Sequence, residues 1–226
     1  MARQERAIRT REAILEAMAL LFIELGYEGA TIAALVARTG LTRGALYFHF
    51  RTKDALARAV LARAVTREGT VPQTYKLQEW LDLGLLLAHR LPREPTLRAA
   101  IHLSVDPKAR GLFGTRWPDW IDVGQDLLVE AKERGELLPH AVPEEIARLA
   151  VGAWTGVQLI TEALPDGRDL SEEIARLYQL ILPNIASPGV LAKLDTSPYR
   201  AERLLGPEKG HGTGTAAQAS ADALRL

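Results

Sequence analysis

The stretch between Thr31 and Lys53, TIAALVARTGLTRGALYFHFRTK, constrains the fold of this chain more than any other segment. Apolar residues at helical spacing predict a short helix that begins at Thr31, whose hydroxyl can accept from a free N–H group of the first turn. Gly40 suits the left-handed position that ends a helix, and Thr42 can cap a second helix over residues 43–48. Two short helices joined by a tight turn that contains glycine indicate a helix-turn-helix, whose second helix enters the major groove of DNA.

The second of these helices carries side chains that suit a DNA reader. Arg43 stands in its first turn, where a guanidinium can contact O6 and N7 of guanine together. Gly44 and Ala45 let the backbone approach base edges. A helical hairpin inside a core is the alternative, but Arg-Gly-Ala is an unusual start for a packing helix. The residues that we expect to contact DNA are Thr31, Thr42, Arg43, Gly44, Ala45, Tyr47, His49, Lys53 and, ahead of them, Arg3.

The segment GYEGATIAALVARTGLTRGALYFHFRTKDAL, with its GYxxxT opening, GALYFHF run and following lysine, resembles the DNA-binding domain of the TetR family of bacterial repressors. The segments MARQERAIRTREAILEA, AKERGELLPH and GVQL are similar to the γ-butyrolactone receptors and pseudo-receptors of actinomycetes. These blocks cover most of the chain to about residue 185. The resemblance implies a homodimeric repressor that binds a pseudo-palindromic operator in double-stranded DNA. It also implies release by a small lactone-like signal in a receptor, or by an antibiotic or another ligand in a pseudo-receptor.

The distribution of charge supports a DNA-binding end. Lys and Arg balance Asp and Glu over the whole chain, at 28 each. Residues 1–67 hold eleven basic and six acidic side chains, a net charge of +5, and the other residues hold 17 and 22, a net charge of −5. A sequence-tolerant architectural DNA binder would spread basic residues over the whole chain. The acidic body argues against that alternative.

Helical periodicity predicts an all-α fold of about nine helices. The expected domains are a three-helix helix-turn-helix unit over 1–53, a helical ligand-binding and dimerisation domain over 54–205, and a disordered tail over 206–226. The expected helices cover residues 4–25, 32–39, 43–48, 54–67, 75–91, 96–105, 117–138, 143–164 and 170–185. A loop is expected over residues 108–116, and one or two short helices are expected after residue 187.

The two long helices over 143–164 and 170–185 carry apolar and very small residues over an arc too wide for one chain's core. Ordinary core helices are the alternative. In TetR relatives these helices pair with their copies in a four-helix interface, and a single helix-turn-helix unit discriminates sequence poorly, which also favours a two-fold dimer. The residues expected in a dimer interface are Leu149, Ala153, Gly156, Leu177, Leu180 and Ile181.

Four tryptophans lie in the body of the chain, where they fit a core or a small-molecule pocket: Trp80, Trp117, Trp120 and Trp154. The resemblance assigns Trp120 to the tryptophan that lines the autoregulator pocket of γ-butyrolactone receptors. Thr155 and Gln158 are candidates for hydrogen bonds with a lactone oxygen, and the Leu83–Leu87 run is a candidate slot for an alkyl tail. The expected ligand residues are Trp120, Thr155, Gln158, Leu87 and His89, and His89 also fits a core position.

Enzyme, metal and cofactor functions find no support in the sequence. The chain has no cysteine, and its five histidines lack HExxH spacing and a neighbouring nucleophilic serine motif. We therefore expect no catalytic residue, no metal and no cofactor. No apolar run approaches the ~20 residues that span a bilayer, and the charged N-terminus lacks the apolar core of a signal peptide. These features predict a cytoplasmic protein without a membrane partner.

Overall fold

The computed structural model describes residues 2–64, 67, 69–164 and 166–206, apart from the side chains of residues 2 and 3. Within these residues every regular element is a helix, and one isolated bridge joins Leu137 to Ala186. The predicted all-α fold is confirmed. The helices of the N-terminal part are α1 (Ala2–Gly29), α2 (Ile32–Thr39), α3 (Arg43–His49) and α4 (Lys53–Leu61). The body contains α5 (Lys76–Arg90), α6 (Pro95–Val105), α7 (Pro107–Phe113), α8 (Trp117–Glu133), α9 (Pro143–Ala163), α10 (Leu170–Ile181), the 3-10 turn η1 (Leu182–Asn184), α11 (Pro188–Leu191) and α12 (Arg200–Leu205).

Several boundaries differ from the prediction. The described residues form twelve α-helices and not about nine. The expected loop over 108–116 is largely helix α7, because Asp106 caps it by accepting from Lys108 N and Ala109 N, and Pro107 fits the first helical position. Helix α4 ends at Leu61 and not at residue 67, since the chain continues in tight turns. Gly26, with a φ of 68°, breaks the first helix as predicted, and the label α1 also covers a further short helical turn that ends at Gly29. Of the predicted tail over 206–226, residues 207–226 lie outside the described residues.

Two further helices end earlier than predicted. Helix α8 stops at Glu133 and not at residue 138, because Gly135 takes a φ of 70° and turns the chain. Helix α10 stops at Ile181, and the residues up to Asn184 continue as a 3-10 turn around a proline that has no N–H to donate.

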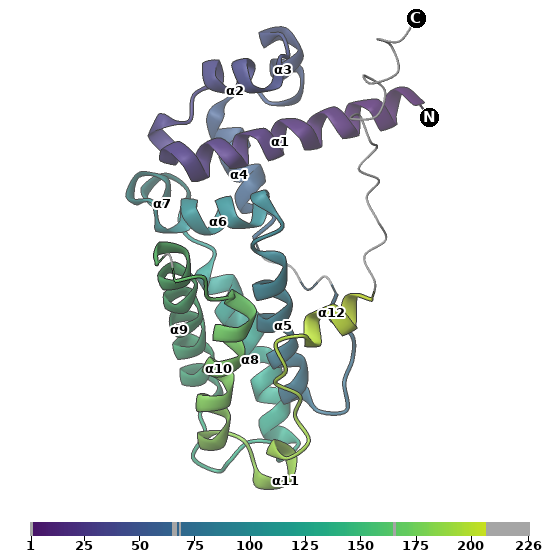
Figure 1. Cartoon of the computed structure of the whole chain (residues 1–226), viewed down its shortest axis with the longest axis vertical. Coiled ribbons are helices and arrows are strands. Elements are labelled where there is room, and N and C mark those ends of the chain that lie inside the picture. Colours follow the sequence, from purple (N-terminus) through teal and green to yellow (C-terminus); the bar gives the residue numbers. More distant parts are fainter. Residues whose placement is uncertain (1, 65–66, 68, 165, 207–226) are drawn as a thin grey trace, which may run out of the picture.

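Two hydrophobic cores are stacked along the molecule. The upper core joins α1–α4 and includes Ile14, Met18, Leu35, Leu46 and Leu56, none of which has any exposed surface. The lower core joins α5, α8, α9 and α10. Figure 1 shows helices α1–α3 at the top, with the long body helices below them. We refer to α1–α4 as the head and to the helices from α5 onward as the body.

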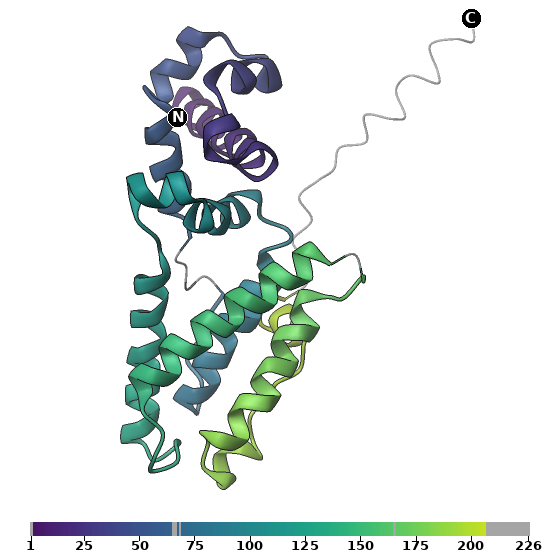
Figure 2. The ribbon, with the colours of Figure 1, turned by 90° about the vertical axis from the view of Figure 1, so that its left-hand side faces the viewer.

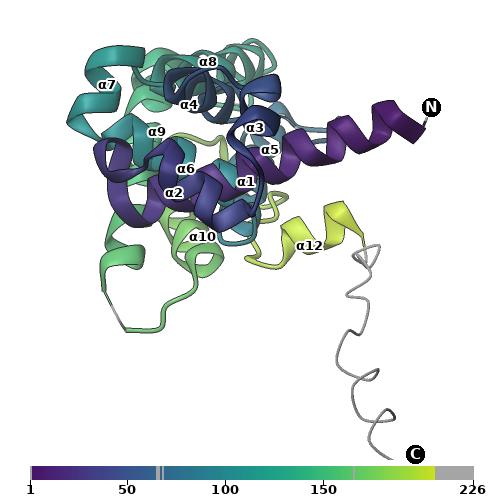
Figure 3. The same ribbon diagram turned by 90° about the horizontal axis from the view of Figure 1, so that it is seen from above.

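Helix α6 lies between the two cores. Its Ala99, Ala100 and Leu103 belong to the upper core, whereas Leu97 belongs to the lower core and Ile101 packs against it. Seen from above, α1 crosses over α6 (Figure 3), and these two helices are in extensive contact. Helix α6 therefore connects the lower core to α1. The predicted boundary after residue 53 stays a prediction, and the packing places α4 with the head.

Candidate DNA interface and ligand cavity

The two helices of the head have the predicted caps. Thr31 Oγ1 accepts from Ala34 N at 3.1 Å, and Thr42 Oγ1 accepts from Ala45 N at 3.2 Å. Gly40 has a φ of 66°, the left-handed conformation that the tight turn requires. Leu46 is the buried residue of α3 and anchors this helix to the upper core. The helix-turn-helix is therefore built by local capping and by one buried leucine on the second helix.

The opposite side of α3 faces solvent. Arg43, Gly44 and Tyr47 are exposed, and Ala45 and His49 are partly buried. Phe48, which the sequence did not suggest as a site residue, is 81% exposed, and its ring lies edge-on to His49 at 5.1 Å. The sequence could have indicated this exposure, because Phe48 follows Tyr47 on a short helix whose buried residue is Leu46. The exposed face thus presents a guanidinium beside a glycine, followed by two aromatic rings.

Lys53 differs from the other expected DNA contacts. Its Nζ donates to the carbonyl of Tyr27 at 2.9 Å and to that of Glu28 at 3.4 Å, and it lies 4.2 Å from the centre of the Tyr27 ring. The hydroxyl of Tyr27 donates to Asp54 Oδ1 at 2.7 Å, and burial together with Asp54 raises the pKa of this tyrosine. Lys53 therefore joins α4 to the end of α1, and its contact with DNA stays a prediction. The side chain of Arg3 lies outside the described residues.

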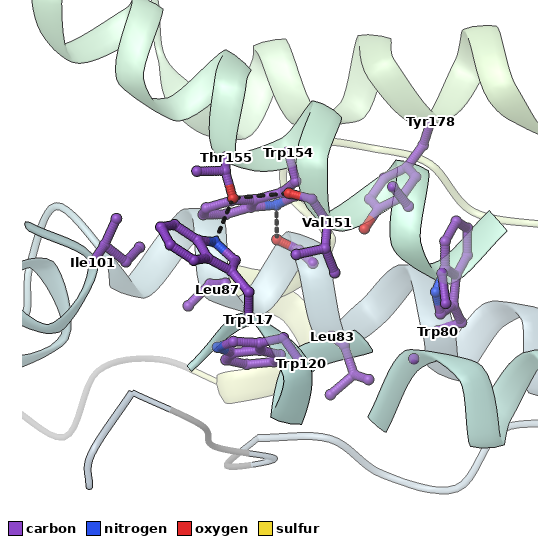
Figure 4. Close-up of a pocket in the computed structure, with 14 residues that line it drawn as sticks. Trp80, Leu83, Leu87, Ile101, Trp117, Trp120, Val151, Trp154, Thr155 and Tyr178 are labelled. Atoms are coloured by element: carbon purple, nitrogen blue, oxygen red, sulfur yellow. Dashed lines mark hydrogen bonds between the residues drawn. The ribbon is translucent and has the colours of Figure 1, made fainter. Parts of the chain in front are cut away.

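The body contains an apolar cavity between α5, α6, α8, α9 and α10, with about 80 Å³ open to a water-sized sphere. Figure 4 shows its aromatic walls. The lining residues are Trp80, Leu83, Gly84, Leu87, Ile101, Trp117, Trp120, Gly124, Ala147, Ala150, Val151, Trp154, Thr155 and Tyr178. No Lys, Arg, Asp or Glu is among them. A cavity with this lining suits an uncharged, largely apolar molecule.

Three of the five expected ligand residues line this cavity: Trp120, Thr155 and Leu87. His89 does not, because it lies two residues beyond Leu87 and so on the other side of α5. Gln158 lies one turn beyond Thr155, past the end of the cavity, where its Nε2 donates to Glu162 Oε2 at 2.8 Å. Placing His89 and Gln158 in this cavity is therefore not supported.

The other lining residues extend the prediction. Trp80, Trp117 and Trp154, for which a core position was the alternative, all line the cavity. Trp117 Nε1 donates to Thr155 Oγ1 at 3.1 Å, and that hydroxyl donates to the carbonyl of Val151 at 2.8 Å (Figure 4). Trp154 Nε1 donates to the carbonyl of Gly84 at 3.2 Å. The sequence analysis did not predict Tyr178 as a lining residue. The one hint was Gly84, a glycine inside an otherwise apolar helix, which leaves room for a large side chain from another helix.

An apolar surface lies on α9 and α10, which are side by side in Figure 2. Leu149, Ile160 and Leu180 are exposed there, and Leu180 is exposed over 74% of its surface. Open space surrounds the positions where Gly152 and Gly156 would carry a Cβ. Among the expected interface residues, Ala153, Leu177 and Ile181 are partly buried, and the last two pack against the lower core. We call this surface the α9–α10 face.

No helix among the described residues has the length and apolar character needed to cross a membrane. Residues 14–60 match the family described as bacterial regulatory proteins, tetR family. The chain is 37% identical to the A-factor receptor protein of Streptomyces griseus, over 86% of this chain and 70% of that protein.

Solved structures of other regulators, among them the following two, are similar to this one. One is TylP, a TetR regulator from Streptomyces fradiae, which has a TM-score of 0.79 and 38% identity over 88% of this chain and 97% of that one. The other is CprB from Streptomyces coelicolor in complex with its biological operator sequence, which has a TM-score of 0.71 and 25% identity over 88% of this chain and 98% of that one. These proteins are regulators and a receptor, in agreement with the expectation that this chain is not an enzyme. The chain belongs to the tetR family of bacterial regulatory proteins.

Proposed function

We propose that this protein is a homodimeric transcriptional repressor that leaves its operator when a small, uncharged, γ-butyrolactone-like molecule enters the body cavity. The observation that carries the proposal is the placement of the cavity. Ile101 of α6 forms part of its wall, while other residues of the same helix pack into the core of the head. A ligand that shifts α6 therefore acts on the DNA-binding end.

The contacts along α6 support this coupling. Midway along the helix, Glu162 of α9 lies 3.1 Å from His102 Nε2 and 3.7 Å from Arg98 Nε. At its C-terminal end, Asp106 Oδ2 accepts from Tyr27 N at 3.1 Å, which fixes α6 to the last turn of α1. Because B-DNA places successive major grooves about 34 Å apart, a small rotation of two heads in a dimer is enough to lose the match.

The dimer, the operator and the ligand class rest on different observations. The α9–α10 face is the proposed dimer interface, and the exposed side of α3 is the proposed contact with a pseudo-palindromic operator. The ligand class is supported by the uncharged cavity and by the similarity to the A-factor receptor protein. Such a repressor acts in the cytoplasm, and the similarity to γ-butyrolactone receptors supports control of secondary metabolism.

A gel-shift titration tests the proposal. The protein is titrated onto the DNA upstream of its own coding sequence, with and without γ-lactones that carry alkyl tails. We expect a shift by a dimer and its release by a lactone at a dose that leaves an unrelated TetR-type repressor bound. Release by an antibiotic but by none of the lactones would identify a pseudo-receptor, and the lactone assignment would be wrong.

A further inference from the structure

The polar groups of the cavity fall into two sets. Those of Trp117, Thr155 and Trp154 are hydrogen-bonded within the protein, to one another or to backbone carbonyls. In the described part of the chain, Trp80 Nε1, Trp120 Nε1 and the Tyr178 hydroxyl have no such partner. These three donors are therefore available to a ligand, and each has to be satisfied by a ligand or by water when it is buried.

The Tyr178 hydroxyl and Trp80 Nε1 are more enclosed than Trp120 Nε1. Tyr178 and Trp80 are each 5% exposed, and their rings meet edge to face at 5.2 Å. Trp117 and Trp120 are partly exposed, so they stand at the outer end of the cavity. Figure 4 shows the Tyr178 hydroxyl pointing toward the space between Val151 and Leu83. The hydroxyl thus marks the inner end.

Gly84 makes room for this hydroxyl. A Cβ at position 84 would lie 1.8 Å from the Tyr178 oxygen, far inside any contact distance. Gly84 also supplies the carbonyl that accepts from Trp154 Nε1. The glycine therefore allows an aromatic hydroxyl and an indole to approach α5 from two sides.

The hydroxyl keeps its proton. Burial raises the pKa of Tyr178, and the negative charge of Asp82 raises it further. Asp82 is fully buried and is held by the guanidinium of Arg200 and by Gln78 Nε2. At the inner end of the cavity, the neutral Tyr178 hydroxyl can therefore donate a hydrogen bond, and the Asp82 carboxylate lies near it. The cavity wall holds no cation that could bind an anionic ligand.

We propose that Tyr178 determines the specificity of the cavity by donating a hydrogen bond from its hydroxyl to the carbonyl oxygen of a neutral lactone. The inference rests on the proposed function and adds the orientation of the ligand. The lactone ring lies at the inner end, beside Trp80 and Tyr178, and the alkyl tail extends between Trp117 and Trp120. The hydroxy acid formed by lactone hydrolysis carries a carboxylate, and it binds more weakly because no cation lines the cavity.

The test compares two probes of nearly the same shape, γ-nonalactone and 2-pentyltetrahydrofuran, which share a ring and a pentyl tail and differ by one carbonyl group. Binding is followed by tryptophan fluorescence, since four tryptophans line the cavity. Tyr178→Phe removes the hydroxyl and leaves no protein partner unpaired. We expect it to weaken lactone binding about three- to tenfold, which is the effect of one hydrogen bond, and to leave binding of the cyclic ether unchanged.

Tyr199→Phe is the matched control, because Tyr199 lies on the surface outside the cavity. It should bind both probes as the wild type does. The ratio of lactone to ether affinity is read within each variant, so a change in stability does not affect the conclusion. The hydrolysed probe, 4-hydroxynonanoate, should bind the wild type at least tenfold more weakly than the lactone.

Each contrary result has a separate meaning. An unchanged lactone-to-ether ratio in Tyr178→Phe overturns the role of Tyr178, but it leaves the proposed lactone receptor standing. Equal loss of both probes assigns Tyr178 to packing alone and also overturns the inference. A wild-type protein that binds neither probe and stays on its operator with both contradicts the proposed function as well as the inference.

Discussion

The upper and lower cores of the molecule differ in what they leave open. The upper core closes around leucines, isoleucine and methionine with no exposed surface, and it holds the recognition helix through Leu46. The lower core surrounds a cavity walled by four tryptophans, with two glycines, Gly84 and Gly124, in the wall. The head is therefore suited to move as one piece, whereas the body is the part whose packing a ligand can change. Helix α6 contributes residues to both cores. A ligand that changes the packing of the lower core can therefore move the head through α6.

The largest expected effect lies on the outer surface of the body. Leu180→Glu should dissociate the proposed dimer, because a charge that faces its symmetry mate in an apolar interface costs several kcal/mol in lost hydration and repulsion. Sedimentation or light scattering measures the change in mass. Val129→Glu is the matched control, since Val129 is also an exposed apolar residue, at 39%, but lies on α8. A Leu180→Glu protein that stays dimeric and binds its operator normally would place the interface elsewhere.

A smaller effect is expected inside the lower core. Trp120→Ala should leave operator binding nearly intact and raise the dose of ligand needed for release. A ligand shifts the equilibrium only through its difference in affinity for the two forms, and loss of an indole contact lowers that affinity by about 2–4 kcal/mol. The dose should therefore rise roughly thirty- to a thousand-fold, as measured by gel shift.

The control for Trp120 is the melting temperature of the same variant. Trp120 is partly exposed and its Nε1 has no partner among the described residues, so its loss should cost less stability than loss of the buried Trp154. An early-melting Trp120→Ala protein that also loses its operator would show that this residue serves the fold. A stable variant that releases at the wild-type dose would contradict the pocket assignment.

The recognition helix of the head supplies the third prediction. Arg43→Ala should weaken specific binding by about 1–3 kcal/mol and relax the preference at one base pair in each half-site. Gel shifts on operator variants measure both effects. Equal losses on operator and random DNA would show instead that Arg43 contacts phosphate.

Lys53→Ala provides the comparison with Arg43. If Lys53 contacts phosphate, affinity for all DNA should fall and the salt slope should flatten by about one unit. Lys53 Nζ donates hydrogen bonds to two carbonyls of α1, so we also expect the melting temperature of this variant to be lower than that of Arg43→Ala. An unchanged melting temperature would show that these bonds contribute little to the stability of the head.

The head could be predicted from the sequence because its structure depends on neighbours in the chain. Thr31, Gly40 and Thr42 act within four residues of their own positions, so their roles are visible in the sequence. The cavity depends on contacts between distant helices. Tyr178 meets Gly84 across more than ninety positions, and no local pattern records that contact.

Two expected ligand residues, His89 and Gln158, lie outside this cavity for the same reason. His89 and Gln158 were chosen by residue type and by nearness in sequence to Leu87 and Thr155. Helix geometry turns His89 to the other side of α5, and one further turn carries Gln158 past the cavity. The Trp120 assignment came from the resemblance, and the structure independently places this side chain in the cavity wall.

The smallest expected effect on stability comes from Asp106, which lies at the end of α6 and contacts α1. Asp106 caps α7 through Oδ1 and accepts from Tyr27 N through Oδ2. Asp106→Asn retains a capping oxygen but sets an amide donor against the Tyr27 N–H, so we expect a loss of about 1 kcal/mol in the free energy of unfolding at neutral pH. Asp106→Asn should therefore also weaken the coupling of ligand to DNA release.

The pH dependence tests whether the charge of Asp106 is responsible. Burial raises the pKa of this carboxyl, but backbone N–H groups and Lys53 outweigh burial, and the pKa lies below its usual value of 3.8. A lowered pKa stabilises the folded state at pH values above 3.8, and this contribution is lost as the pH falls through the folded-state pKa. The difference in stability between the wild type and Asp106→Asn should thus be constant from pH 8 to about pH 5 and should shrink below pH 4. A difference that stays the same at low pH would show that the shape of the cap, and not its charge, joins α6 to α1.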